Sequence, residues 1–206
     1  MSGWAEPLLF VALLSAFIWI APALPLALAV ACILGLAAIP IASNILHHDA
    51  PARLGFRLDN LTAAARHVAP VTALGALAIV AAGRLSGAAP RADIALAALG
   101  YPLWGLAQQY ALQGFVHRRI AERWGENRTA AALSAGLFAL VHLPNPVLVA
   151  GTAVAGYGWC RAHQRAPNLV VLALSHALLA ALLLAALPLA WHHDLRIGPT
   201  YWTFPR

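Results

Sequence analysis

Charged residues are scarce in this chain of 206 residues, at 10% of the total, and lysine is absent. A soluble domain normally carries about 25% charged residues, so a chain this poor in charge cannot cover a water-facing surface. The sequence is 62% hydrophobic and its mean hydropathy is +0.75. These values exclude an ordinary soluble domain and predict an integral membrane protein.

Cysteine is also rare, and the sequence has no CxxC pair. Cys32 and Cys160 both lie in apolar stretches. We therefore expect two buried small side chains, not a disulfide or a redox site.

Long apolar stretches fill most of the chain and show no alternation of polar and apolar residues. In hydrocarbon the backbone must satisfy its own hydrogen bonds, which leaves helices or a closed barrel, and the unbroken pattern favours helices. The sequence predicts an all-α, polytopic transmembrane helix bundle with about seven membrane helices, forming a single domain over residues 1–206. The predicted segments are 7–21, 22–46, 68–83, 92–116, 130–143, 146–160 and 169–190. The fifth and sixth are short for a span of about 20 residues and could instead form a re-entrant pair.

All thirteen basic residues are arginines, and their distribution predicts the orientation. Nine lie in loops 47–66, 117–129 and 161–167, whereas four lie on the opposite side. The positive-inside rule then places the N-terminus in the cytoplasm. We interpret these loop arginines as topology signals that contact lipid headgroups, and expect membrane lipids, not nucleic acid, as their partners.

Polar side chains within the apolar segments are candidates for a functional site, because such residues need partners in hydrocarbon. Gln108, Gln109 and Gln113 lie in the fourth segment, His142 in the fifth and His176 in the seventh. At about 1.5 Å per residue, Gln109, His142 and His176 all fall near the middle of the bilayer. These residues predict a mid-membrane cavity, although glutamine and histidine also serve as interhelical hydrogen-bonding groups.

Three short stretches in this order resemble the signatures of the CPBP family, the CAAX-protease and bacteriocin-processing group. Residues 138–142 (FALVH) fit the family's Phe-x-x-x-His. Residues 108–114 (QQYALQG) stand where the family has Glu-Glu-x-x-x-Arg, and 176–180 (HALLA) keep the His but carry Ala in place of Asn or Asp. Residues 54–57 (LGFR) resemble the family's lead-in, so that the resemblance covers residues 53–187.

The resemblance implies an intramembrane endopeptidase acting on a hydrophobic or lipidated peptide substrate, and a bacterial inner membrane as its location. It implies His142, His176, Gln108 and Gln109 as catalytic residues, with Gln113 and Asn145 in substrate binding. A glutamine amide cannot act as a general base, so a histidine would have to do so, with a glutamine orienting the substrate carbonyl.

Two alternatives remain open from the sequence. A catalytically inactive relative would bind a hydrophobic peptide as a chaperone, scaffold or immunity protein. A cofactor carrier would use the two histidines to hold haem or a divalent metal, but glutamine is a poor metal ligand and no acidic helper is present. We therefore assign no metal-binding residue, while a divalent metal stays possible as a cofactor.

Overall fold

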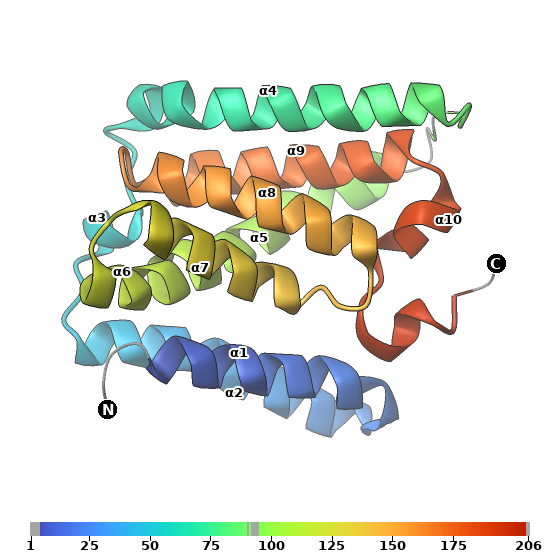
Figure 1. The fold of residues 1–206 in the computed structure, drawn as a ribbon. Coiled ribbons are helices and arrows are strands. Elements are labelled where there is room, and N and C mark those ends of the chain that lie inside the picture. Colours follow the sequence, from blue (N-terminus) through green and yellow to red (C-terminus); the bar gives the residue numbers. More distant parts are fainter. Residues whose placement is uncertain (1–4, 90, 92–94, 205–206) are drawn as a thin grey trace.

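The computed structural model describes residues 5–89, 91 and 95–204, and these residues form helices joined by short links, with no strand among them. The helices lie side by side along one common direction (Figure 1). In chain order the longer elements are α1 (Ala5–Ile20), α2 (Leu26–Leu46), α4 (Leu61–Leu85), α5 (Ala95–Gln109), the π-helix η2 (Tyr110–His117), α6 (Arg118–Trp124), α7 (Arg128–Leu140), α8 (Pro146–His163) and α9 (Leu169–Ala186). The short elements are η1 (Ala21–Ala23), α3 (Pro51–Leu54), α10 (Leu189–His192), η3 (His193–Leu195) and η4 (Gly198–Tyr201). The prediction of an all-α bundle is confirmed.

Four helical stretches are long and apolar enough to cross a membrane by length and composition: Ala5–Ala23, Leu26–Leu46, Leu61–Leu85 and Leu169–Ala186. The helix α7 has only 13 residues, or about 20 Å at 1.5 Å per residue, which is short of a bilayer core of about 30 Å. It packs along α8 as an antiparallel pair (Figure 1). The structure therefore agrees with the prediction that the fifth segment, 130–143, is short for a full membrane span.

Two predicted loops are partly helical. The helix α4 begins at Leu61, seven residues before the predicted segment, and the helix after Gln109 continues through η2 and α6 to Trp124. It ends at Gly125, whose φ of +81° suits glycine. Hydropathy missed both extensions because the added turns carry arginine and histidine, which are compatible with a helix outside the hydrocarbon.

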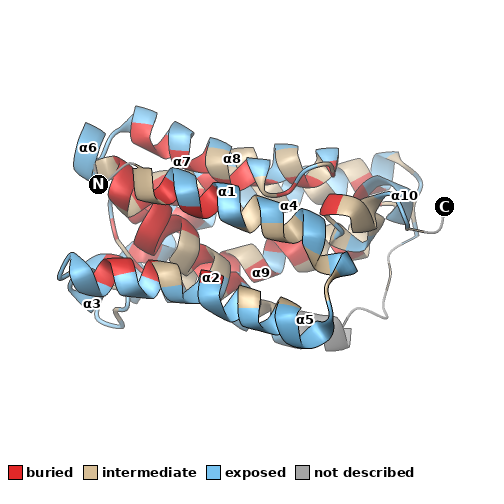
Figure 2. Cartoon of the chain, turned by 90° about the horizontal axis from the view of Figure 1, so that it is seen from below, coloured by how far each residue is buried: buried red, intermediate tan, exposed pale blue. Residues whose placement is uncertain are grey.

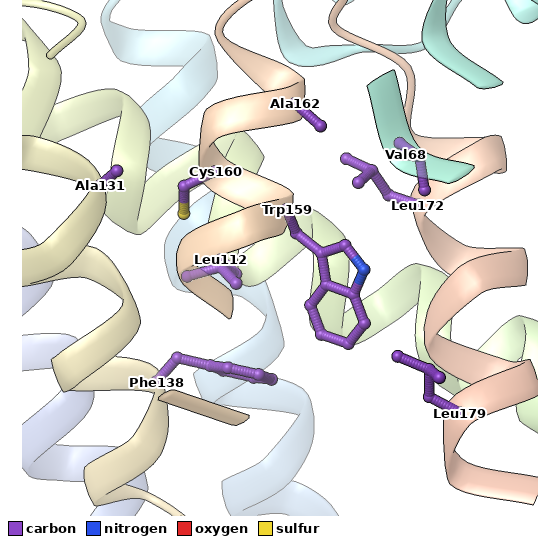
Figure 3. Packing of buried hydrophobic residues seen from close by; sticks show 9 residues of the cluster. All are labelled: Val68, Leu112, Ala131, Phe138, Trp159, Cys160, Ala162, Leu172 and Leu179. Atoms are coloured by element: carbon purple, nitrogen blue, oxygen red, sulfur yellow. The ribbon is translucent and has the colours of Figure 1, made fainter. Parts of the chain in front are cut away.

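The core lies where α7, α8 and α9 meet α4 and η2, and Figure 3 shows its apolar side chains. Phe138 and Trp159 are its largest members. Cys160 also belongs to this cluster, and it and Cys32 are free cysteines. Figure 2 shows buried residues gathered inside, whereas the outer side of α2 is exposed. Leucines such as Leu26 (79% exposed) and Leu103 (75%) therefore face outward, as a surface against lipid requires.

The loop arginines lie at one end of the bundle. Figure 1 shows α3 and α6, which carry several of them, at the end where the N-terminus is marked. For Arg119 the prediction that these arginines contact lipid headgroups is wrong, because its side chain is 0% exposed. Its Nη2 donates to Asp49 Oδ2 at 2.6 Å and to Asn44 Oδ1 at 2.9 Å, and its Nε donates to Ser43 Oγ at 3.1 Å.

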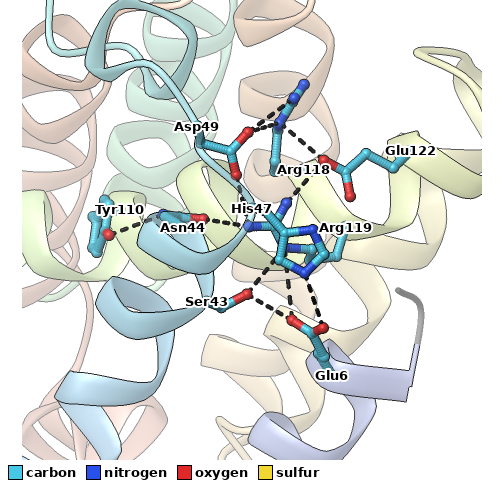
Figure 4. A network of polar contacts seen from close by, with 9 residues as sticks. All are labelled: Glu6, Ser43, Asn44, His47, Asp49, Tyr110, Arg118, Arg119 and Glu122. Atoms are coloured by element: carbon cyan, nitrogen blue, oxygen red, sulfur yellow. Dashed lines mark hydrogen bonds and ion pairs between the residues drawn. The ribbon is translucent and has the colours of Figure 1, made fainter. Parts of the chain in front are cut away.

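Two glutamates complete this network around Arg119 (Figure 4). Arg119 Nη1 donates to Glu122 Oε1 at 2.8 Å, and Glu6 Oε2 lies 3.8 Å from Arg119 Nε. Because Glu6 lies in α1 and Asp49 follows α2, the guanidinium joins the α1–α2 hairpin to α6. The position of that hairpin matters for function, since α1 forms one wall of the cavity described next.

Candidate active site

A large apolar cavity of about 1340 Å³ lies between α1 and the rest of the bundle. Three of the predicted site residues line it: Gln108 from α5, His142 from the turn after α7, and His176 from α9. The remaining lining is mostly apolar and includes Phe10 of α1 and Leu112 of η2. A site of this kind, apolar with a few convergent polar groups, is typical of a ligand-binding or catalytic pocket.

His142 carries its ring proton on Nδ1. The Nδ1–H group donates to the carbonyl oxygen of Phe138 at 2.7 Å, and a carbonyl can only accept. In the neutral ring Nε2 is then an unprotonated acceptor. The turn places His142 in the cavity because α7 ends at Leu140, and the Phe138 ring packs edge-on against the imidazole at 4.8 Å between centroids.

His176 has the opposite arrangement. Its Nδ1 accepts from Gln109 Nε2 at 3.4 Å, so its ring proton is on Nε2. Gln109 is itself fixed, because its Oε1 accepts from Gln113 Nε2 at 3.3 Å. This bond joins two side chains that are four positions apart in the chain. Both glutamines are buried and neither lines the cavity, so Gln113 contacts Gln109 where we expected it to contact substrate.

The His176 ring is also held by aromatic contacts that sequence reasoning missed. Trp159 of α8 stacks on it at 4.8 Å between centroids, and Trp159 Nε1 donates to Ser175 Oγ at 2.9 Å. Thr72 Oγ1 lies 2.6 Å from the same Ser175 oxygen. Ser175 therefore points away from the cavity and orients the tryptophan. The sequence does hold one indication of these contacts, Trp159 itself, because a buried indole N–H requires a hydrogen-bond partner.

Asn145 lies outside the cavity lining and is completely buried. Its Oδ1 accepts from Leu148 N at 3.2 Å and caps α8, while its Nδ2 donates to the carbonyl oxygens of His192 and Arg196 at 2.8 and 3.1 Å. We therefore reassign Asn145 from substrate binding to holding the backbone.

A further histidine, His117 of η2, is buried inside the bundle at 3% exposure. Its Nδ1 donates to Ser134 Oγ at 2.9 Å, since that hydroxyl itself donates to Ala130 O. Its Nε2 accepts from Gln164 Nε2 at 3.1 Å. Both ring nitrogens are satisfied by the protein, which gives His117 a structural role.

The donor set of the cavity does not fit a resident metal. A catalytic zinc takes three protein ligands from histidine, carboxylate or thiolate. The cavity lining here offers two imidazoles and the Asp194 carboxylate among amide and mostly apolar groups, and these three do not form a group that could hold a metal ion. Within residues 5–89, 91 and 95–204 there is no group of three His, Cys, Asp or Glu side chains that could hold a metal ion.

The fold and cavity define a polytopic helical membrane protein with a His/Gln site inside the bundle. Residues 90–182 match the family described as type II CAAX prenyl endopeptidase Rce1-like. This match contains all three motif stretches, 108–114, 138–142 and 176–180, and supports the predicted resemblance to the CPBP family over residues 90–182. No curated protein and no solved structure matches.

Proposed function

We propose that this protein is a membrane-embedded endopeptidase that cleaves a membrane-associated peptide or lipid-linked substrate at the His142/His176 site. One observation carries the proposal: two imidazoles share a cavity, and one offers a free acceptor nitrogen while the other offers an N–H donor. The similarity to type II CAAX prenyl endopeptidases over residues 90–182 supports the same class of reaction.

The two rings divide the work of hydrolysis. His142 Nε2 removes a proton from water, and the water oxygen bonds to the carbonyl carbon of the scissile peptide. The negative charge that develops on the carbonyl oxygen accepts a hydrogen bond from His176 Nε2–H. When the carbon–nitrogen bond breaks, the His142 imidazolium returns the proton to the leaving amine. Protons balance without a carboxylate.

The glutamines position the groups that take part in these steps. They do not take over the role of the two glutamates that the family has where this chain has Gln108 and Gln109. Gln109 keeps the His176 proton on Nε2, and Gln113 keeps the Gln109 amide in the orientation that does so. Gln108 lines the cavity, where its amide orients the substrate carbonyl.

The proposed class of substrate follows from the residues that line the cavity. A volume of about 1340 Å³ exceeds the 300–1,000 Å³ that is usual for small-ligand pockets, and its apolar lining suits a hydrophobic segment or a lipid chain. We propose a hydrophobic or lipidated peptide as the partner, no nucleic acid, and a bacterial inner membrane with the arginine-rich end of the bundle in the cytoplasm.

Removing the oxyanion donor tests this assignment. We expect His176→Ala to lower kcat by about 10²–10³-fold, the usual cost of one such donor. The measurement is the initial rate of cleavage of lipidated peptides by protein in vesicles, with the products identified by mass. His67→Ala is the matched control, because His67 is an exposed histidine on α4 outside the cavity lining. Equal rates in all three proteins would contradict the proposal.

A second candidate function is binding without cleavage, and the position of Gln109 favours it. The residue at the family's second glutamate position is buried, and its amide is used within the protein. A relative of this kind would hold a hydrophobic peptide in the same cavity.

Restoring a carboxylate separates the two functions. Gln108→Glu places a general base at the cavity wall, and we expect cleavage to rise by about 10²-fold. Gln109→Glu is the comparison, and we expect no gain from it. Its side chain does not line the cavity, and a carboxylate there would accept from His176 Nδ1–H and leave Nε2 without its proton. Peptide binding with no cleavage by either the parent or Gln108→Glu would establish the binding function instead.

A further inference from the structure

The segment from His192 to Tyr201, here called the C-terminal strap, crosses one end of the cavity beyond the region of family similarity. Leu195, Ile197 and Thr200 of the strap line the cavity. Figure 1 shows the strap beside the link between α7 and α8, at the end of the bundle opposite the arginine-rich loops. The strap therefore lies next to the turn that carries His142.

Three hydrogen bonds attach the strap to that turn. Asn145 Nδ2 donates to His192 O at 2.8 Å and to Arg196 O at 3.1 Å. Gly198 N donates to Leu143 O at 2.8 Å. Both residues of the turn that take part, Leu143 and Asn145, lie within three positions of His142.

The backbone between the two carbonyls that Asn145 binds has an unusual conformation. His193, Asp194 and Leu195 all have left-handed φ angles, of 48°, 54° and 56°. Residues other than glycine rarely adopt this conformation, and it persists where the surrounding structure holds it. Because the Asn145 amide binds the carbonyl before and the carbonyl after these residues, it clamps the left-handed turn at both ends.

We propose that Asn145 is a positioning residue that couples the C-terminal strap to the His142 turn and so fixes the imidazole in the cavity. The inference rests on the proposed function for its effect on rate. The position of the His142 ring can be observed whether or not the protein cleaves a substrate.

Asn145→Asp tests the coupling with a minimal change. The aspartate keeps the oxygen that caps α8 but loses the amide donor to the strap. Asn168→Asp is the matched control: Asn168 is equally buried, caps α9 through Val171 N, and its Nδ2 donates to Arg57 O and Asn60 Oδ1 at the other end of the bundle.

The readout is the ¹⁵N NMR signal of the His142 Nδ1–H group in histidine-labelled protein, assigned by its loss in His142→Ala. We expect the signal to shift or disappear in Asn145→Asp and to stay unchanged in Asn168→Asp. An unchanged signal in Asn145→Asp, or the same change in both variants, would overturn the proposal.

Gly198→Ala affects the same turn through the hydrogen bond from Gly198 N to Leu143 O. It replaces Asn145→Asp as the test if that variant does not fold. A Cβ on Gly198, at φ +58°, would lie 2.8 Å from Ile18 Cγ2 and 3.0 Å from Ile18 O, so the strap or α1 at Ile18 must shift. Gly87→Ala is its control, because Gly87 also has a positive φ, of +71°, but has open space around it. The His142 signal should change only in Gly198→Ala, and an unchanged signal there would count against the coupling.

Kinetics then distinguish this inference from the proposed function. A displacement of about 1 Å at a reacting group can cost about 10²-fold in rate, so Asn145→Asp should lower kcat with little change in KM. If the parent shows no cleavage but the His142 signal still responds to Asn145→Asp, the proposed function fails and the coupling stands. If cleavage is present and the signal does not respond, the coupling alone fails.

Discussion

Replacing His142 by alanine is expected to lower kcat for peptide cleavage by about 10²–10⁴-fold, with a small effect on KM. Its Nε2 is the unprotonated imidazole nitrogen that the cavity offers to water, because the Nδ1 proton is held by the Phe138 carbonyl. The measurement is the initial rate over a range of substrate concentrations in vesicles. Substrate contacts with the apolar walls are unchanged, which is why the loss should appear in kcat.

Chemical rescue controls for a merely structural effect of that substitution. The alanine leaves space for a small base, so added imidazole should restore part of the rate in His142→Ala and leave the parent rate unchanged. A His142→Ala protein that cleaves at the parent rate would remove His142 from the catalytic role.

Replacing Arg119 by alanine is expected to lower the free energy of unfolding by about 3–5 kcal/mol, the cost of breaking a buried ion pair by removing one partner. The substitution leaves the Asp49 carboxylate, whose side chain is 2% exposed, with Arg118 as its remaining cation. It also removes the link between the α1–α2 hairpin and α6. Unfolding with increasing denaturant in detergent micelles measures the effect.

Arg123→Ala is the matched control for Arg119→Ala, because Arg123 is an exposed arginine of the same helix α6. A surface substitution of this kind usually changes stability by less than about 0.5 kcal/mol. Equal losses in the two variants would show that the buried network does not fasten the hairpin.

The helices could be predicted from the sequence because hydropathy reports directly on which residues face hydrocarbon. Within the described residues the seven apolar segments are largely helical, and the main errors fall at polar helix ends, as at Leu61 and after Val116. Arg119 shows the limit of this reasoning. Its partners Ser43, Asn44 and Asp49 lie 70 or more positions away, so no local pattern distinguishes it from the partly exposed Arg118 beside it.

The candidate site could be predicted in part. Matching depth brought together His142, His176 and the glutamines, since side chains of equal depth on neighbouring helices can meet in one cavity. Depth does not give the direction of a side chain, however. For that reason Gln109 and Gln113 were expected at the cavity but lie behind His176, and Asn145 was expected to meet substrate but binds the strap.

The central claim is that His142 and His176 act as a base and an oxyanion donor on one bound substrate. Residues that act as a unit show strongly non-additive effects on rate. The direct measurement is a double-mutant cycle of initial cleavage rates for the parent, His142→Ala, His176→Ala and the double variant. We predict that the double variant is no slower than the worse single variant. A double variant whose loss equals the product of the two single losses, or single variants with no loss, would contradict the account.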